Sequence, residues 1–202
     1  HGPPGFVRSP DARTLHVDVR PPAGSPLAAH LRDGAALGLL GIQPHTRRRN
    51  RMNGRVARVG STGFDVEVVQ SFGNCPKYIR TREAFHFDDE MPGMPQPLAA
   101  LDDAARALIA TADMLFIASA HANGVDVSHR GGAPGFVSVG SGDVLTLPDY
   151  AGNFFFNTLG NLLLEPRAGL LFIDFDSGDL LHVSARAEIV WDGDEVAAYP
   201  GA

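Results

Sequence analysis

Two short runs of polar and basic residues are the places where this chain could bind an anion. The first run, Ser128-His129-Arg130-Gly131, places a hydroxyl, an imidazole and a guanidinium beside a glycine. Such donors suit a phosphate, because arginine binds two oxygens at once and glycine lets the backbone approach closely. Taken alone, the run is more typical of a polar β-turn with a solvated arginine.

The second run is the one dense basic cluster of the sequence, Arg47, Arg48, Arg49 and Arg51. Alternate residues of a strand share a face, so Arg48 would point away from the other three. A cluster of this kind also protects an edge strand from aggregation, or contacts RNA. RNA is the poorest of these interpretations, because the net charge is −6 and no aromatic residues are interleaved with the arginines.

Two asparagines lie at the start of a predicted helix. Apolar residues recur at helical spacing from Asn153 to Glu165, and Pro166 ends the segment. At a helix start, unpaired N–H groups and the positive end of the dipole favour an anion, so Asn153 and Asn157 are candidate ligand contacts. The alternative for Asn153 is a simple N-cap, which uses the same geometry.

Cys75 is the only cysteine in the sequence, and we expect it to be structural. A lone cysteine is more often a small buried apolar residue than a nucleophile, and no histidine or aspartate stands at an activating spacing. The eight histidines lack metal-binding spacing, so no metal site is expected. The single cysteine also favours a reducing compartment, and we expect the cytoplasm.

The composition is that of a folded, soluble protein. The 202 residues are 44% hydrophobic and 20% charged. The apolar runs are far shorter than the roughly 20 residues of a membrane span, and the negative net charge disfavours nucleic acid and anionic lipid. The first residues, His1-Gly-Pro-Pro-Gly, include neither an initiator methionine nor a signal peptide, so we expect a fragment or a trimmed product.

The chain repeats itself at an offset of 130 to 131 residues. The matched segments are Gly2–Val7 with Gly132–Val137, Gly38–Ile42 with Gly169–Ile173, and Gly54–Val59 with Ala185–Val190. Glycines and apolar residues stay in step with one residue of slippage, which indicates a tandem duplication. We expect a first copy at 1–90 that lacks its opening strand, a linker at 91–97, and a second copy at 98–202.

Short strands between turn residues predict an antiparallel barrel with flanking helices, which is a mainly β fold of the α+β kind. The expected strands are residues 63–69, 114–119, 135–139, 144–147, 169–173 and 180–190. The expected helices are residues 25–31, 98–112 and 153–165, and residues 70–79 are expected to form a turn that leads into a helical segment.

The order of elements in the second copy resembles the pyridoxamine 5'-phosphate oxidase-like family of FMN-binding split barrels. The resemblance depends on a polar segment Ala122–Gly131 between strands, a helix ending Leu164-Glu-Pro166, the strand Gly169–Ile173 and the final segment Val183–Glu188. It implies tandem FMN-binding split β-barrels. Family members bind FMN between two subunits, and a duplicated chain can do so between its two halves.

The resemblance also implies roles for the candidate residues. Copy two would hold the flavin phosphate, and the basic strand of copy one would contact the ring edge or ribityl chain. Related proteins have a similar Cys-Pro-Lys-Tyr turn, where the lysine could reach a phosphate or substrate anion. The implied FMN contacts are Ser128, His129, Arg130, Asn153, Asn157, Arg48, Arg49 and Lys77. The family's basic helix start aligns near Phe156–Thr158, where the basic pair is absent.

The sequence therefore predicts an FMN-binding oxidoreductase domain with an unknown small-molecule electron donor or acceptor and no assigned catalytic residue. One alternative is a non-catalytic module that binds flavin, haem or a deazaflavin. Another is a purely structural barrel. The expected assembly is a homodimer or an internal pseudo-dimer.

Overall fold

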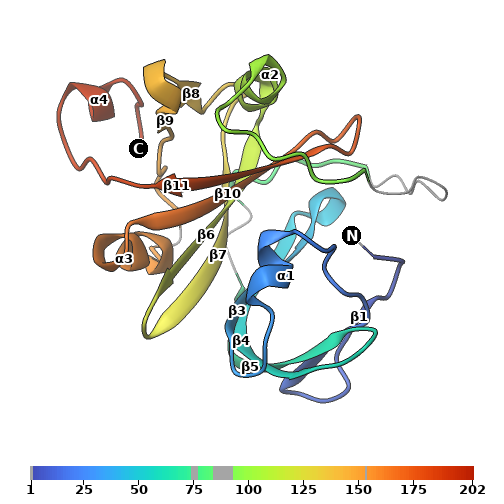
Figure 1. Ribbon diagram of the computed structural model, residues 1–202. Coiled ribbons are helices and arrows are strands. Elements are labelled where there is room, and N and C mark those ends of the chain that lie inside the picture. The colour runs from blue at the N-terminus through green and yellow to red at the C-terminus, as the bar shows by residue number, and fades with distance from the viewer. Residues whose placement is uncertain (1, 74–76, 84–92, 153) are drawn as a thin grey trace.

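Two antiparallel sheets form the body of the protein in the computed structural model, which describes residues 2–73, 77–83, 93–152 and 154–202 (Figure 1). The strand order is β1-β2-β5-β4-β3 in the first sheet and β11-β10-β6-β7 in the second. The strands are β1 (Val7–Arg8), β2 (Thr14–Val17), β3 (Ala36–Gln43), β4 (Arg48–Val59), β5 (Phe64–Gly73), β6 (Met114–His121), β7 (Gly124–Gly131), β8 (Ser138–Val139), β9 (Leu145–Thr146), β10 (Arg167–Ile173) and β11 (Leu180–Arg186). The helices are α1 (Pro26–His30), α2 (Asp103–Thr111), α3 (Asn157–Leu164) and α4 (Asp194–Ala197), with 3-10 turns at Pro44–Thr46 and Ser141–Asp143. The predicted fold class, mainly β with flanking helices as in a split barrel, is confirmed.

Each sheet has its own apolar core. In the first sheet, Val17, Phe64 and Val66 are buried together. In the second, Leu115, Phe172 and Ile109 are fully buried with residues of α2 and α3 around them. Helix α2 begins at a capped end, because the Asp102 side chain accepts a hydrogen bond from the Ala105 N–H at 2.8 Å. Helix α3 packs on β6 and β7 and so lies beside the junction of the sheets.

The two sheets meet where β7 packs against β3 and β4. Gly38 permits this contact, since a Cβ at that position would lie 3.0 Å from Val127 Cγ2 on β7. Strand β7 is at the edge of its sheet, whereas β4 has a hydrogen-bonded neighbour on both sides. The interpretation of the arginine cluster as a protected edge strand is therefore wrong.

Corresponding hairpins in the two halves have the same register. The corresponding pairs are Arg8↔His16 with Ser138↔Thr146, at an offset of 130, and Ala36↔Arg55 with Arg167↔Arg186, at an offset of 131. Helix α3 likewise begins 131 residues after α1. The two halves therefore place corresponding residues at corresponding points of a hairpin, a helix and a second hairpin.

Several expected elements differ from the structure. Ser128, His129 and Arg130 lie inside strand β7, so the polar-turn interpretation of this run is wrong. Arg47 precedes β4 in a left-handed conformation with φ of 55°, so it does not share the strand's alternation. The expected strand at 135–139 is reduced to β8, because turns occupy residues 133–135.

Two expected helices also differ. Helix α3 begins at Asn157 rather than Asn153, and Phe154–Phe156 before it are not helical. Strand β5 continues to Gly73 and residues 77–78 form a turn, but no helix follows in residues 79–83, so the expected helical segment is wrong within the residues described. Asn153, Cys75 and residues 91–92 of the expected linker lie outside the described residues.

Within the described residues, no helix is long and apolar enough to cross a membrane. The same residues contain no group of three or more histidine, cysteine, aspartate or glutamate side chains that could hold a metal ion.

Candidate functional site

A hollow lies at the junction of the two sheets, and four of the sequence-predicted residues line it together. Arg49 comes from β4, Lys77 from the turn after β5, and His129 and Arg130 from β7. The strand alternation explains part of this arrangement. Arg49 and Arg51 share the face of β4 that meets the hollow, while Arg48 is exposed and does not line it.

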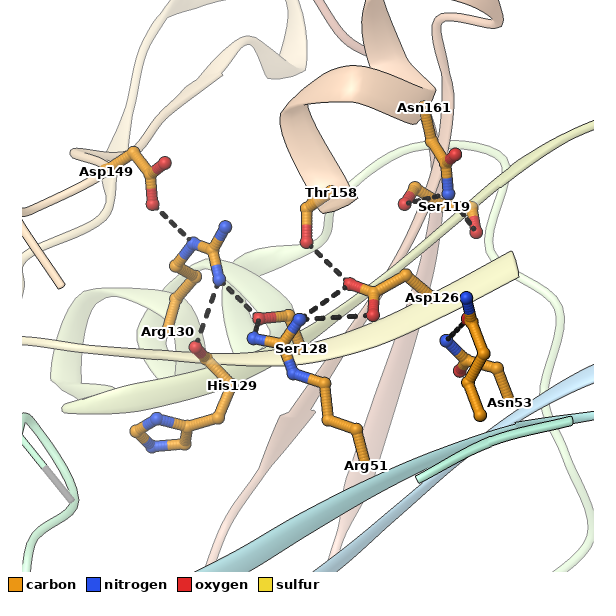
Figure 2. A network of polar contacts seen from close by, with 11 residues as sticks. Arg51, Asn53, Ser119, Asp126, Ser128, His129, Arg130, Asp149, Thr158 and Asn161 are labelled. Atoms are coloured by element: carbon orange, nitrogen blue, oxygen red, sulfur yellow. Dashed lines mark hydrogen bonds and ion pairs between the residues drawn. The ribbon is translucent and has the colours of Figure 1, made fainter. Parts of the chain in front are cut away.

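Arg51 connects the two sheets through a buried ion pair, which Figure 2 shows in detail. Its Nη1 donates to both carboxylate oxygens of Asp126 on β7, at 3.1 and 3.0 Å, and its Nη2 donates to Ser128 Oγ at 2.6 Å. Thr158 Oγ1, in the first turn of α3, donates to the same carboxylate at 2.8 Å. Because Nη1 bonds the carboxylate and Nη2 bonds the hydroxyl, the guanidinium of Arg51 is fixed in position and orientation.

Arg130 is held on the other side of Ser128. Its Nη1 donates to Ser128 Oγ and to the carbonyl of His129, and its Nε pairs with Asp149 at 2.7 Å. Burial lowers the pKa of the Arg130 guanidinium, and Asp149 acts in the opposite direction. Ser128 is fully buried and does not line the hollow, so its hydroxyl orients two arginines from behind.

His129 lines the hollow as a neutral imidazole. It is 4% exposed, and burial lowers its pKa to about 3, with further lowering by Arg49, Arg130 and Arg51. Its Nε2 is buried and has no hydrogen-bond partner in the part of the chain that the structure describes. Its ring meets Phe116 edge-on at a centroid distance of 5.9 Å.

The segment of Lys77 and Tyr78 docks on the loop that precedes α3. Lys77 Nζ and Tyr78 Oη both donate to the carbonyl of Ala151, each at 3.1 Å, and Tyr78 stacks on Tyr150 at 5.5 Å. These contacts bring the ammonium group of Lys77 to the hollow. Asn157, the first residue of α3, is half-buried and does not line the hollow.

Aromatic side chains form another wall of the hollow. Phe154, Phe155 and Phe156 line it and are exposed, and Phe154 has a φ of 59°. Phe72 of β5 contacts Phe155 at a ring distance of 5.5 Å and lies 5.7 Å from the guanidinium carbon of Arg51. Exposed aromatic rings next to cations suit a ligand that is both planar and anionic.

The charge of the hollow fits a phosphate. Among the described lining residues, Arg49, Arg51, Lys77 and Arg130 are cationic and Asp149 is the one carboxylate. Asp126 lies directly behind them, so the net charge of this group is positive by about two, similar in size to the charge of roughly −2 on a phosphate monoester. The donors and rings therefore suit a ligand that carries a phosphate and a planar ring system.

Comparison with models of protein families shows which family the chain belongs to. A family model described as pyridoxamine 5'-phosphate oxidase matches residues 101–201, half of the chain. The chain belongs to the pyridoxamine 5'-phosphate oxidase family. The resemblance predicted from the sequence is thus confirmed, and it supports a flavin-binding split-barrel domain. No curated protein and no solved structure matches the chain. The family match includes His129 and Arg130 but neither Arg49 nor Lys77.

Sequence reasoning missed the buried residues that support the site. Asp126, Thr158 and Asp149 were not candidates, and Arg51 was recognised only as part of the basic cluster. The sequence carried no local signal for them. Asp126, Ser128 and Arg130 alternate with Val125 and Val127 in β7, a pattern that predicts the polar residues on the solvent face of a strand, and their burial follows from the packing of β7 on β4.

Proposed function

We propose that the hollow binds FMN and that the protein is a flavin-dependent oxidoreductase domain of the pyridoxamine 5'-phosphate oxidase type. The observation that carries the proposal is the meeting of Arg49 from the first sheet with His129 and Arg130 from the second around one hollow. FMN would supply the hydride or electron transfer. The chain's residues bind and orient it: Arg130 and Lys77 take the phosphate, while Arg49 contacts the ribityl chain or ring edge.

We also propose that the two halves are tandem copies, 1–90 and 98–202, joined by 91–97. The matching hairpin registers support this division. In such a chain the two copies form an internal pseudo-dimer, and each supplies part of one flavin site, as two subunits would. The single cysteine supports a cytoplasmic location for the domain.

The test is FMN titration followed by flavin fluorescence, on the wild-type protein and on two adjacent arginine variants. Arg49→Ala removes a cation from the hollow and should weaken FMN binding about 10- to 100-fold. Arg48→Ala removes the same charge from the exposed face of the same strand and should change the dissociation constant less than about twofold. Equal weakening by both variants would exclude a specific role for the hollow, and a wild-type protein that binds no FMN would overturn the proposal.

A non-catalytic flavin module is the second candidate, and the state of His129 favours it. With a pKa of about 3, this imidazole does not act as a general acid near neutral pH. The two candidates differ in a stopped-flow experiment with NADH or NADPH. Bleaching of the flavin absorbance within seconds and its return with an acceptor support the oxidoreductase, and an unreactive bound flavin supports the module.

A further inference from the structure

The carboxylate of Asp126 is the most enclosed charge at the junction of the two sheets. Its side chain is fully buried, and it accepts two hydrogen bonds from Arg51 and one from Thr158. Burying a carboxylate destabilises a protein unless its oxygens are paired and hydrogen-bonded. These three hydrogen bonds therefore make the burial of Asp126 possible. Asp126 does not line the hollow itself.

The donors to Asp126 come from two different elements. Arg51 lies on β4 of the first sheet, and Thr158 lies in the first turn of α3, which packs on the second sheet (Figure 2). One carboxylate on β7 therefore ties β4 to α3 across the junction. Arg51 is 75 residues away in the chain, so this contact exists only when both sheets are in place.

The hydroxyl group of Ser128 links Asp126 and Arg51 to Arg130, which lines the hollow. Ser128 Oγ accepts a hydrogen bond from Arg51 Nη2 at 2.6 Å and another from Arg130 Nη1. The side chains of Asp126, Ser128 and Arg130 share one face of β7, so the carboxylate, the hydroxyl and the guanidinium form a continuous row. Because Asp126 fixes Arg51, it also fixes the neighbour against which Arg130 is oriented.

We propose that Asp126 is a positioning residue for anion binding: it holds the guanidinium of Arg51 and, through Ser128, that of Arg130 in the orientation that receives the ligand's phosphate. This inference depends on the proposed function, since the ligand it concerns is FMN. It predicts a role for a residue that never touches the ligand.

The direction in which Asp126→Asn changes the affinity for FMN distinguishes a positioning role from a purely electrostatic one. Asp126 brings a negative charge close to an anion site. If only charge mattered, Asp126→Asn would remove a repulsion and tighten FMN binding. If Asp126 positions the arginines, the same variant weakens FMN binding, because the amide cannot accept both bonds from Arg51 with a charge-assisted geometry.

The experiment measures the dissociation constants of FMN and riboflavin for each variant, together with the unfolding temperature without flavin. Asp126→Asn should weaken FMN about tenfold and riboflavin less than about twofold, because riboflavin lacks the phosphate. Asp143→Asn is the control: it removes a carboxylate that pairs with Arg106 outside the lining of the hollow, and it should change FMN binding less than about twofold.

The inference is overturned if Asp126→Asn binds FMN as tightly as the wild type or more tightly, if it weakens riboflavin equally, or if Asp143→Asn has the same effect. Should Asp126→Asn fail to fold, Thr158→Val replaces it, since it removes one donor to Asp126 without changing any charge. This variant should weaken FMN about two- to fivefold with riboflavin unchanged, and no change would overturn the inference. A wild-type protein that binds neither flavin instead overturns the proposed function itself.

Discussion

Strands β4 and β11 are the second strands of two hairpins with matching registers, yet the same face of each has a different environment. Arg49 and Arg51 of β4 correspond to Leu180 and His182 of β11, at the offset of 131 set by the hairpin registers. Arg51 is buried at 3% exposure, whereas Leu180 and His182 are exposed. The backbone pairing is thus shared, and what covers the face decides whether a charged residue can be buried there.

The residues that bury this face of β4 belong to β7 of the second sheet. Asp126 and Ser128 on β7 provide the acceptors that make a buried guanidinium possible, and β5 completes the sheet on the opposite side of β4. Within the described residues, strand β11 is an edge strand with β10 as its one hydrogen-bonded neighbour. The buried ion pair between the sheets therefore needs unlike side chains on its two sides: a cation from β4 and its acceptors from β7.

The largest expected loss of stability comes from removing Arg51 from its buried ion pair with Asp126. Arg51→Met leaves Asp126 buried without its partner and should lower the free energy of unfolding by about 3–5 kcal/mol. His182→Met, the corresponding change in β11, should cost less than about 0.5 kcal/mol because that side chain is exposed. Urea denaturation measures both. A double variant Arg51→Met, Asp126→Leu should recover most of the loss, and its failure to do so would contradict the pairing argument.

A smaller loss of stability is expected from a substitution at Gly54, a position where β4 requires a glycine and β11 does not. The pairing of β4 with β5 is irregular between Asn53 and Gly54, and a Cβ on Gly54 would lie 2.1 Å from the carbonyl oxygen of Glu67. Gly54→Ala must shift the backbone and should destabilise the protein by about 1–3 kcal/mol. The corresponding residue of β11 is already Ala185, and Ala185→Gly should cost no more than about 1 kcal/mol. Equal costs in urea denaturation would show that the two strands are packed alike.

The smallest effect, taken per pH unit, comes from the titration of His129 beside the cations that β4 contributes. His129 has a pKa of about 3 in the folded protein against 6.5 as the ordinary value. Between these values the unfolded chain binds a proton that the folded protein excludes, so stability falls as the pH decreases from 6.5 towards 3, by at most about 1.4 kcal/mol per pH unit from this residue. Urea denaturation at several pH values should show a shallower slope for His129→Gln. For Arg49→Ala the loss of stability should end at a higher pH, because the pKa of His129 is then lowered less. An unchanged slope in His129→Gln would show that this imidazole is protonated alike in both states.

Much of the secondary structure could be predicted because its signals are local. The strand expected at Gly169–Ile173 lies within β10, and the amphipathic helix expected at 98–112 contains α2, whose capped start is nearer Asp102. The helix expected from Asn153 was placed too early, since apolar spacing continued through the phenylalanines while the backbone turned helical only at Asn157. Periodicity reports which residues can share a face, and it does not report where the backbone begins to coil.

The sequence by itself determined the order of elements, the two cationic runs and the repeat that relates the halves, because spacing and residue type are properties of neighbouring positions. Only the tertiary structure decided that Arg49 faces the hollow while Arg48 faces solvent, and that Ser128 is buried behind the arginines, outside the lining of the hollow. It also decided the partnership of Arg51 with Asp126. A charge can be buried only where an opposite charge meets it, and that meeting depends on how two sheets pack, which no local pattern encodes.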